Sequence, residues 1–67
     1  MLKNNIKTVL KARKTSVLRL SEIIGLTYAS THSLANREDL SDTKIGTLVK
    51  TADALGVDVN TLYTVVQ

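Results

Sequence analysis

Gly25 separates two short segments that both have the pattern of an amphipathic helix. Ser16 precedes the first segment and Thr27 precedes the second. Hydroxyl side chains at such positions accept hydrogen bonds from the free amides of a helix's first turn. A glycine directly after a helix readily adopts the left-handed conformation that ends it. The sequence therefore predicts helices over residues 17–24 and 28–36, joined by a short turn of Gly25, Leu26 and Thr27.

Inward-facing side chains recur in both segments at the three- and four-residue intervals of an α-helix. These side chains are Leu20, Ile23 and Ile24 in the first segment, and Thr31, Leu34 and Ala35 in the second. Ser21 is small enough to let the two helices approach each other, and we expect Leu26 to anchor the turn in the core. Two short helices joined by a glycine-containing turn constitute a helix-turn-helix motif.

The segment before this motif is predicted to be an amphipathic helix over residues 5–14, capped by Asn4 or Asn5. It is strongly basic, because six Lys and Arg side chains precede the first acidic residue, Glu22. These cations are Lys3, Lys7, Lys11, Arg13, Lys14 and Arg19. A basic end on a small domain suggests an anionic partner such as DNA, although a solvated helix face has the same pattern.

A polar stretch over residues 37–43 is predicted to be a loop, followed by a fourth helix over 44–55. Asp42 or Thr43 can cap the start of this helix, and Gly56 occupies the position of a left-handed stop. Its inward side chains are expected to be Ile45, Leu48, Thr51, Ala52 and Leu55.

The last segment is predicted to be a fifth helix, capped by Asp58, with Leu62 and Tyr63 facing inward. By propensity, residues 61–66 could also form a strand. A single terminal strand would lack a partner in this chain unless it paired between subunits, so a helix is favoured. The expected fold class is all-α: a compact five-helix arrangement in one domain that spans residues 1–67.

Composition excludes several other classes of protein. The chain has no cysteine and one histidine, His32, so neither a disulfide framework nor a metal site is expected. No nucleophile motif or phosphate-binding glycine pattern is present, so we expect no enzyme activity, cofactor or small-molecule substrate. No apolar run reaches the roughly 18 residues of a membrane span, and no secretory signal is evident, which predicts a cytoplasmic protein without a membrane partner.

The segment from Val17 to Thr27 resembles the Cro/phage-repressor type of helix-turn-helix family, also described as lambda-repressor-like or XRE. The resemblance continues through Leu48, Lys50, Ala52, Asp53, the run Ala54-Leu55-Gly56-Val57, and Leu62. It implies a compact five-helix domain whose third helix reads operator DNA, usually as a homodimer. It also implies a regulator of transcription in a genetic switch of a bacteriophage or prophage.

The resemblance assigns DNA-contacting positions to the segment 28–37 and to Val17. Base-reading positions fall on Tyr28, Ala29, His32 and Ser33, and phosphate-contacting positions fall near Val17, Asn36 and Arg37. The chain departs from the family's pattern at several of them. Val17 stands where a glutamine is usual, Thr31 replaces a buried aliphatic residue, and Arg37 stands where a glycine often ends the helix. The segment 28–36 also carries no Arg, Lys or Gln.

These departures indicate an alternative function in protein–protein interaction. Apolar and tyrosine side chains on an exposed face often mark a protein contact. Val17, Leu18, Tyr28 and His32 would form such a surface. The alternative is therefore an antirepressor or co-repressor that binds the DNA-binding domain of a partner phage repressor. The two functions can coexist in one protein.

Overall fold

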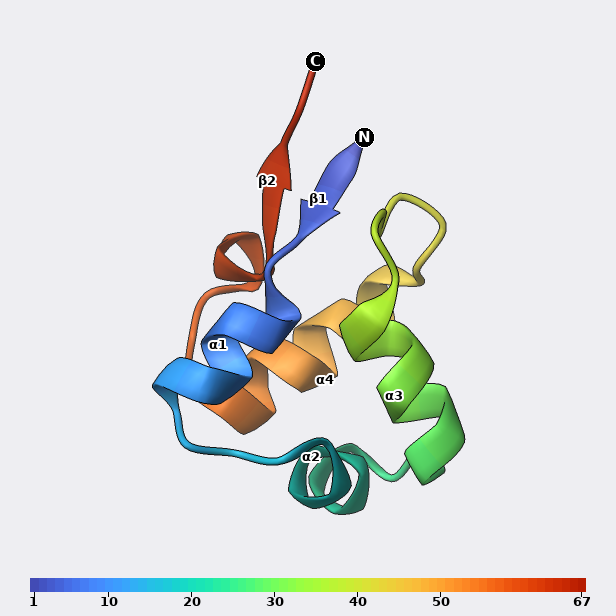
Figure 1. Cartoon of the computed structure of the whole chain (residues 1–67), viewed down its shortest axis with the longest axis vertical. Helices are drawn as coiled ribbons and strands as arrows, with labels where there is room; N and C mark the ends of the chain where they lie inside the picture. Colours follow the sequence, from blue (N-terminus) through green and yellow to red (C-terminus); the bar gives the residue numbers. More distant parts are fainter.

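Four α-helices, a short 3-10 helix and a two-stranded sheet make up the computed structural model, which describes residues 1–67 (Figure 1). Along the chain they are β1 (Leu2–Asn4), α1 (Ile6–Ala12), α2 (Val17–Ile24), α3 (Tyr28–Asn36), α4 (Ile45–Leu55), η1 (Val59–Leu62) and β2 (Tyr63–Val65). The helices surround a single core, and the sheet projects from one end of the molecule (Figure 1). None of the helices is long and apolar enough to cross a membrane.

The core consists of twelve buried hydrophobic residues contributed by every helix and by the loop before α4. They are Ile6, Val9, Leu10, Leu20, Ile24, Leu34, Ala35, Leu40, Leu48, Ala52, Leu55 and Leu62. Two threonines are also fully buried, Thr31 and Thr51. Their hydroxyls donate to the carbonyl oxygens of Thr27 and Thr47 one helical turn earlier, at 2.9 and 2.8 Å. Each buried hydroxyl is thereby satisfied, which removes most of the free-energy penalty of its burial.

The bounds of α2 and α3 agree with the prediction, and so do their caps. The Ser16 hydroxyl accepts from the amide of Arg19 at 3.0 Å, and the Thr27 hydroxyl accepts from the amide of Ser30 at 3.1 Å. Gly25 has φ +74°, the left-handed conformation that ends α2. Gly56 ends α4 in the same way, with φ +68°.

The prediction of a fifth helix and of an all-α fold was wrong at the C-terminus. Asp58 occupies the N-cap position, but its side chain makes no capping bond, and only the four-residue 3-10 helix η1 follows. Leu62 is buried and Tyr63 packs partly against the core, as expected. The chain then forms β2, which pairs antiparallel with β1 so that Leu2 lies opposite Val65. The sequence analysis found no partner within the chain for a C-terminal strand, and β1 at the N-terminus is that partner.

The first and fourth helices begin or end differently from the prediction. The first helix, α1, is shorter than the predicted 5–14, because the chain turns out of the helix after Ala12 and Lys14 adopts a positive φ of 52°. The fourth helix, α4, starts at Ile45, so neither Asp42 nor Thr43 caps it. Lys44 takes the N-cap position without a side-chain bond.

Three side chains expected in the core are exposed instead: Ile23 (48 %), Leu26 (40 %) and Ile45 (68 %). Helical periodicity places Ile23 and Ile45 on the apolar side, but each lies at its margin, beyond the surface that the neighbouring helices cover. Ile23 lines a shallow depression between α2 and α4, beside Lys50 and Ala54. Because Leu26 is exposed, it does not anchor the turn in the core as predicted.

Candidate nucleic-acid interface

The helices α2 and α3 pack against each other, and α2 buries one small polar residue, Ser21. Ser21 is buried, and its hydroxyl donates to the carbonyl oxygen of Leu18 at 2.6 Å. The amides of Gly25 and Leu26 both donate to the Ser21 carbonyl oxygen, which closes the turn tightly. The turn directs α3 away from α2, so that α3 has one side packed on the core and another side in solvent (Figure 1).

The exposed side of α3 carries five of the residues predicted to contact DNA. Tyr28, Ala29, His32, Ser33 and Asn36 are all exposed, in contrast to the buried side of the helix. The aromatic rings of Tyr28 and His32 lie with centroids 5.9 Å apart and tilted by 34°. The face carries hydroxyl, imidazole, amide and methyl groups and no Lys, Arg, Asp or Glu side chain.

Two of the predicted contact residues are engaged within the chain. The side-chain amide of Asn36 donates to the carbonyl oxygen of His32 at 2.8 Å. The guanidinium of Arg37 donates to the Thr43 hydroxyl at 2.9 Å and to the Ser33 carbonyl oxygen at 3.4 Å. Arg37 is only half-buried, so it holds the loop before α4 while part of its charged group remains accessible.

Asn4 secures the C-terminal end of α3, a role that the sequence did not reveal. Its side-chain amide donates to the carbonyl oxygens of Leu34 and Arg37, each at 2.8 Å, and more distantly to that of Ala35 at 3.4 Å. Its side-chain oxygen accepts from the Ile6 amide at 2.8 Å, which begins α1. One side chain thus joins the start of α1 to the end of α3. The sequence predicted that Asn4 or Asn5 caps the first helix. The bonds from Asn4 to α3 could not be predicted in this way, because they join residues far apart in the sequence.

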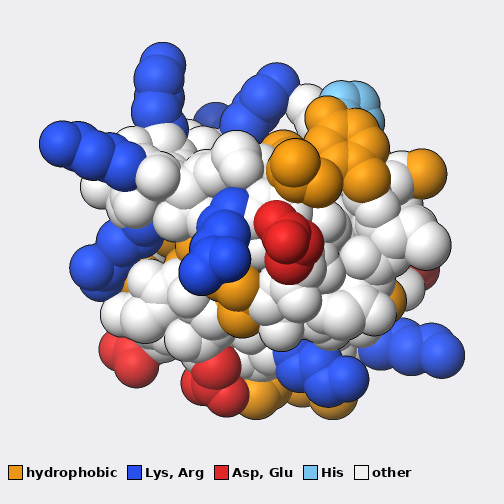
Figure 2. Space-filling view, turned by 90° about the horizontal axis from the view of Figure 1, so that it is seen from below, with side chains coloured by type: hydrophobic (Ala, Val, Ile, Leu, Met, Phe, Trp, Pro, Cys, Tyr) orange, Lys and Arg blue, Asp and Glu red, His pale blue; other side chains and the backbone are white.

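Several basic side chains that precede α3 in the sequence extend into solvent. Figure 2, which views the molecule from the α2 side, shows Lys and Arg side chains projecting from several places and apolar side chains gathered next to the single histidine. Lys7, Lys11, Lys14 and Arg19 are exposed and make no side-chain hydrogen bond within the chain.

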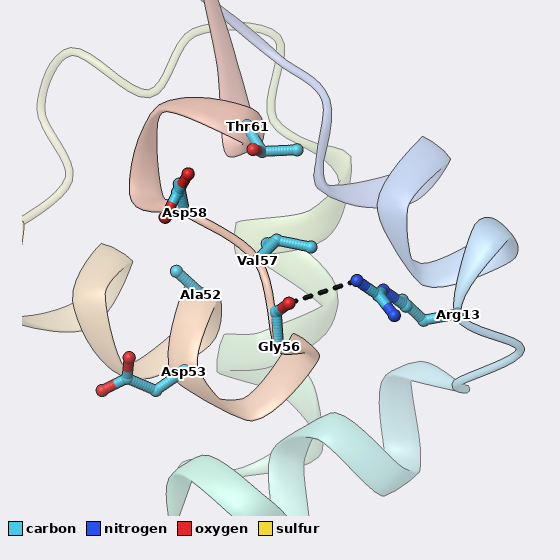
Figure 3. A pocket seen from close by; sticks show the side chains of 7 residues that line it. All are labelled: Arg13, Ala52, Asp53, Gly56, Val57, Asp58 and Thr61. Carbon is cyan, nitrogen blue, oxygen red and sulfur yellow. Dashed lines mark hydrogen bonds between the residues drawn. The ribbon is translucent and has the colours of Figure 1, made fainter.

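The side chain of Arg13 points toward the C-terminal end of α4. Its guanidinium donates to the carbonyl oxygen of Gly56 at 3.1 Å, at the C-terminal end of α4 (Figure 3). It lines an open depression together with Asp53 and Asp58. The depression has mixed charge and no enclosing wall, and no group of three or more metal-ligating side chains comes together anywhere in the chain.

The residues predicted to bind a protein partner are exposed to different degrees. Leu18 and Tyr28 expose 56 % and 52 % of their surface, and His32 is exposed beside Tyr28. Val17 is only half-buried and packs partly against the core, so it contributes less free surface than predicted. The structure thus leaves Leu18, Tyr28 and His32 as the accessible members of this set.

These features define the chain as a helix-turn-helix domain: two short capped helices, a glycine turn between them, and a second helix with one side open to solvent. The family model of the Cro/C1-type HTH DNA-binding domain matches residues 5–67, and the chain belongs to this family. A crystal structure from Bacteroides fragilis, described as that of a proposed DNA-binding protein, superimposes with a TM-score of 0.82. Its sequence is 28 % identical, and the match covers 96 % of this chain and 100 % of that one. No curated protein matches the chain significantly.

Proposed function

We propose that this domain is a transcriptional regulator that binds operator DNA by placing α3 in the major groove, as part of a genetic switch of phage or prophage type. The observation that carries the proposal is the exposed side of α3, where Tyr28, Ala29, His32 and Ser33 lie together on a helix fixed by the turn. A helix in this position can enter a major groove with its N-terminal residues against the base edges. In this proposal residues 1–67 act as one domain in the cytoplasm.

The chemistry of the α3 face suits a modest rather than a strong reader of bases. The Ser33 hydroxyl can donate or accept, the His32 imidazole can donate to a purine, and the Ala29 methyl can contact a thymine methyl. None of these makes the two-pronged contact with guanine that Arg provides. Lys7, Lys11, Lys14 and Arg19 therefore supply most of the affinity in this proposal, through phosphates.

The experiment has two stages because the operator sequence is unknown. Random duplexes are first selected for binding to the protein, and the best sequence is then titrated by fluorescence anisotropy at two salt concentrations. The double change of His32→Ala and Ser33→Ala should weaken binding to the selected sequence by about tenfold, since it removes two single hydrogen bonds that each contribute a net of about 0.5–1.5 kcal/mol. Asn60→Ala, on the exposed surface of η1, is the matched control and should leave binding unchanged. Selection of no preferred sequence, or equal weakening by the control, would contradict the proposal.

A second candidate function is binding to a partner phage repressor, as an antirepressor or co-repressor. The observation that favours it is the exposure of Leu18, together with that of Tyr28 and His32, whose rings lie next to each other. An apolar contact tolerates salt, whereas DNA affinity falls steeply as salt rises.

The two functions are separated by changing Leu18 and Tyr28 to Ser. Both side chains are exposed, so the fold should be retained. If the domain acts on a repressor, the double variant should lose binding to that repressor's DNA-binding domain at high salt. Tight operator binding by the isolated protein that survives the Leu18 change would instead leave no reason to invoke a repressor partner.

A further inference from the structure

The exposed side of α3 has a single group whose charge can change near neutral pH, the imidazole of His32. The helix from Tyr28 to Asn36 contains no Lys, Arg, Asp or Glu, and His32 is the one histidine of the chain. Histidine is the side chain that ordinarily gains or loses its charge between about pH 5 and pH 8. A single proton therefore decides whether this side of α3 is neutral or carries one positive charge.

The contacts of His32 leave its ring free to bind a group outside the chain. The imidazole lies at the surface (Figure 2), one helical turn after Tyr28, and the centroids of the two rings are 5.9 Å apart. The Asn36 side chain donates to the backbone carbonyl oxygen of His32 at 2.8 Å, and neither ring nitrogen bonds to another residue. Both ring nitrogens are therefore available to a ligand.

No charged group of a neighbouring element is bonded to the imidazole. The helices packed against α3 are α1 and α2, and their charged side chains are Lys7, Lys11, Arg19 and Glu22. All four are exposed, and none of them hydrogen-bonds to His32. Arg37, directly after α3, is bonded to Thr43 instead. The chain thus provides no carboxylate bonded to the imidazole, so an anionic partner for its charged form has to come from a ligand.

We infer that His32 takes up a proton when α3 binds operator DNA, and that the protonated ring selects guanine. The inference rests on the proposed function, which places this side of α3 against the base edges. A neutral imidazole has one donor and one acceptor nitrogen, whereas an imidazolium has two donors and no acceptor. Guanine is the base whose major-groove edge offers two acceptors, N7 and O6, and no donor. Protonation therefore changes a contact that several bases satisfy into one that guanine satisfies best.

The phosphates of DNA favour the same protonated form. Duplex DNA carries one negative charge per about 1.7 Å of its axis, so an imidazole in the groove lies in a negative potential. A cation is stabilised there, and binding therefore draws a proton from the solvent. By linkage, operator affinity is greatest at acidic pH, where His32 is already protonated, and it falls as the pH rises and the proton is lost. One proton can change the association constant by at most about tenfold per pH unit.

The test is a titration at about pH 5.5 and at about pH 8, followed by fluorescence anisotropy, of a duplex selected at the lower pH. The unmodified protein should bind about five- to tenfold more tightly at the lower pH, because hydrogen bonds from a charged donor are roughly twice as strong as neutral ones. In His32→Gln, which keeps an N–H donor but takes up no proton, the two affinities should agree within about twofold. Ser33→Ala is the matched control on the same helix side, and it should weaken binding by the same factor at both pH values.

Two further measurements address the proton and the base separately. Calorimetric titrations in buffers of different ionisation enthalpy should show uptake of up to about one proton per bound chain, and none in His32→Gln. Replacing the contacted guanine of the selected duplex by adenine should weaken binding more at the lower pH than at the higher one, because adenine presents a donor beside its N7 acceptor. Absence of any such guanine would overturn the base selection.

The failure of this inference is distinguishable from failure of the proposed function. His32→Gln leaves every other titratable group in place, so a pH effect that this variant retains would overturn the inference. Sequence-specific binding that is equally tight at both pH values would also overturn it and would leave the proposed function intact. Selection of no preferred sequence at either pH would contradict the inference and the proposed function together. Circular dichroism at both pH values checks that each variant retains the fold.

Discussion

Removing the side chain of Asn4 should weaken the attachment of α3 to the rest of the domain. The Asn4→Ala change deletes two 2.8 Å bonds to carbonyl oxygens of Leu34 and Arg37, and the 2.8 Å bond from the Ile6 amide. Each such bond contributes a net of about 1 kcal/mol, and water can replace part of it at this half-buried position. We therefore expect a loss of about 2–3 kcal/mol in the free energy of unfolding. That is a large share of the roughly 3–10 kcal/mol typical of a domain of this size.

The assay is thermal unfolding followed by circular dichroism. A loss of this size should lower the Tm by about 10–20 °C, since 1 kcal/mol corresponds to about 4–8 °C in a domain of 60–100 residues. Asn4→Asp separates the two attachments, because a carboxylate can still accept from the Ile6 amide but cannot donate to the α3 carbonyl oxygens. It should also be destabilising, because negative charge at the C-terminal end of a helix is unfavourable.

Asn60→Ala is the control for these changes, since Asn60 is exposed on η1. It should shift the Tm by no more than a few degrees. The reasoning would be refuted if Asn4→Ala left the Tm within about 2 °C of the unmodified protein, a shift worth less than about 0.5 kcal/mol. In that case solvent would replace the three bonds without loss.

Three further changes test other parts of the structure. Bonds from the Ser41 hydroxyl and from nearby backbone amides lower the pKa of Asp39 from 3.8 to about 2. Asp39→Asn should therefore reduce stability above about pH 4, and its difference from the unmodified protein should shrink as the pH falls towards 2 in acid-unfolding curves. Gly25→Ala should lower the free energy of unfolding by about 1–2 kcal/mol, because Gly25 has a positive φ. Gly46→Ala, inside α4, should raise the free energy of unfolding by up to about 1 kcal/mol. Denaturant titrations that show a stabilised Gly25→Ala variant or a destabilised Gly46→Ala variant would contradict this reasoning. Changing Lys7 and Lys11 to Gln should lower the salt slope of DNA binding by about 2, and an unchanged slope would show that they contact no phosphate.

The helices that could be predicted well are those whose signals are local. A hydroxyl residue at the start and a glycine at the end determine α2, and Thr27 begins α3, so their bounds were found from neighbouring residues alone. The exposed side of α3 was also predictable, because helical periodicity separates Leu34 and Ala35 from Tyr28 and His32. These inferences need no knowledge of the remainder of the chain.

The features that were missed depend on residues far apart in the sequence. The strand β2 has only three residues, and its partner β1 lies at the other end of the chain, so neither strand has a local signal beyond propensity. The two attachments of Asn4 to α3 have the same origin. Ile23 and Ile45 show a different limit, because periodicity gives the direction of a side chain but not the width of the surface that its neighbours cover.

The pairing of β1 with β2 also has a consequence for the order in which the domain assembles. The N-terminal amine of Met1 donates to the Val66 carbonyl oxygen at 3.3 Å across 65 positions of sequence, so the sheet closes a loop of almost the entire chain. Closing such a loop has a high entropic cost until the intervening helices have packed, whereas α2 and α3 adjoin through three residues. The helix pair can therefore form early and the sheet last. In hydrogen exchange, the amides of the sheet should open by fraying of the chain ends, at lower free energy than the amides of the buried turns of α2 and α3.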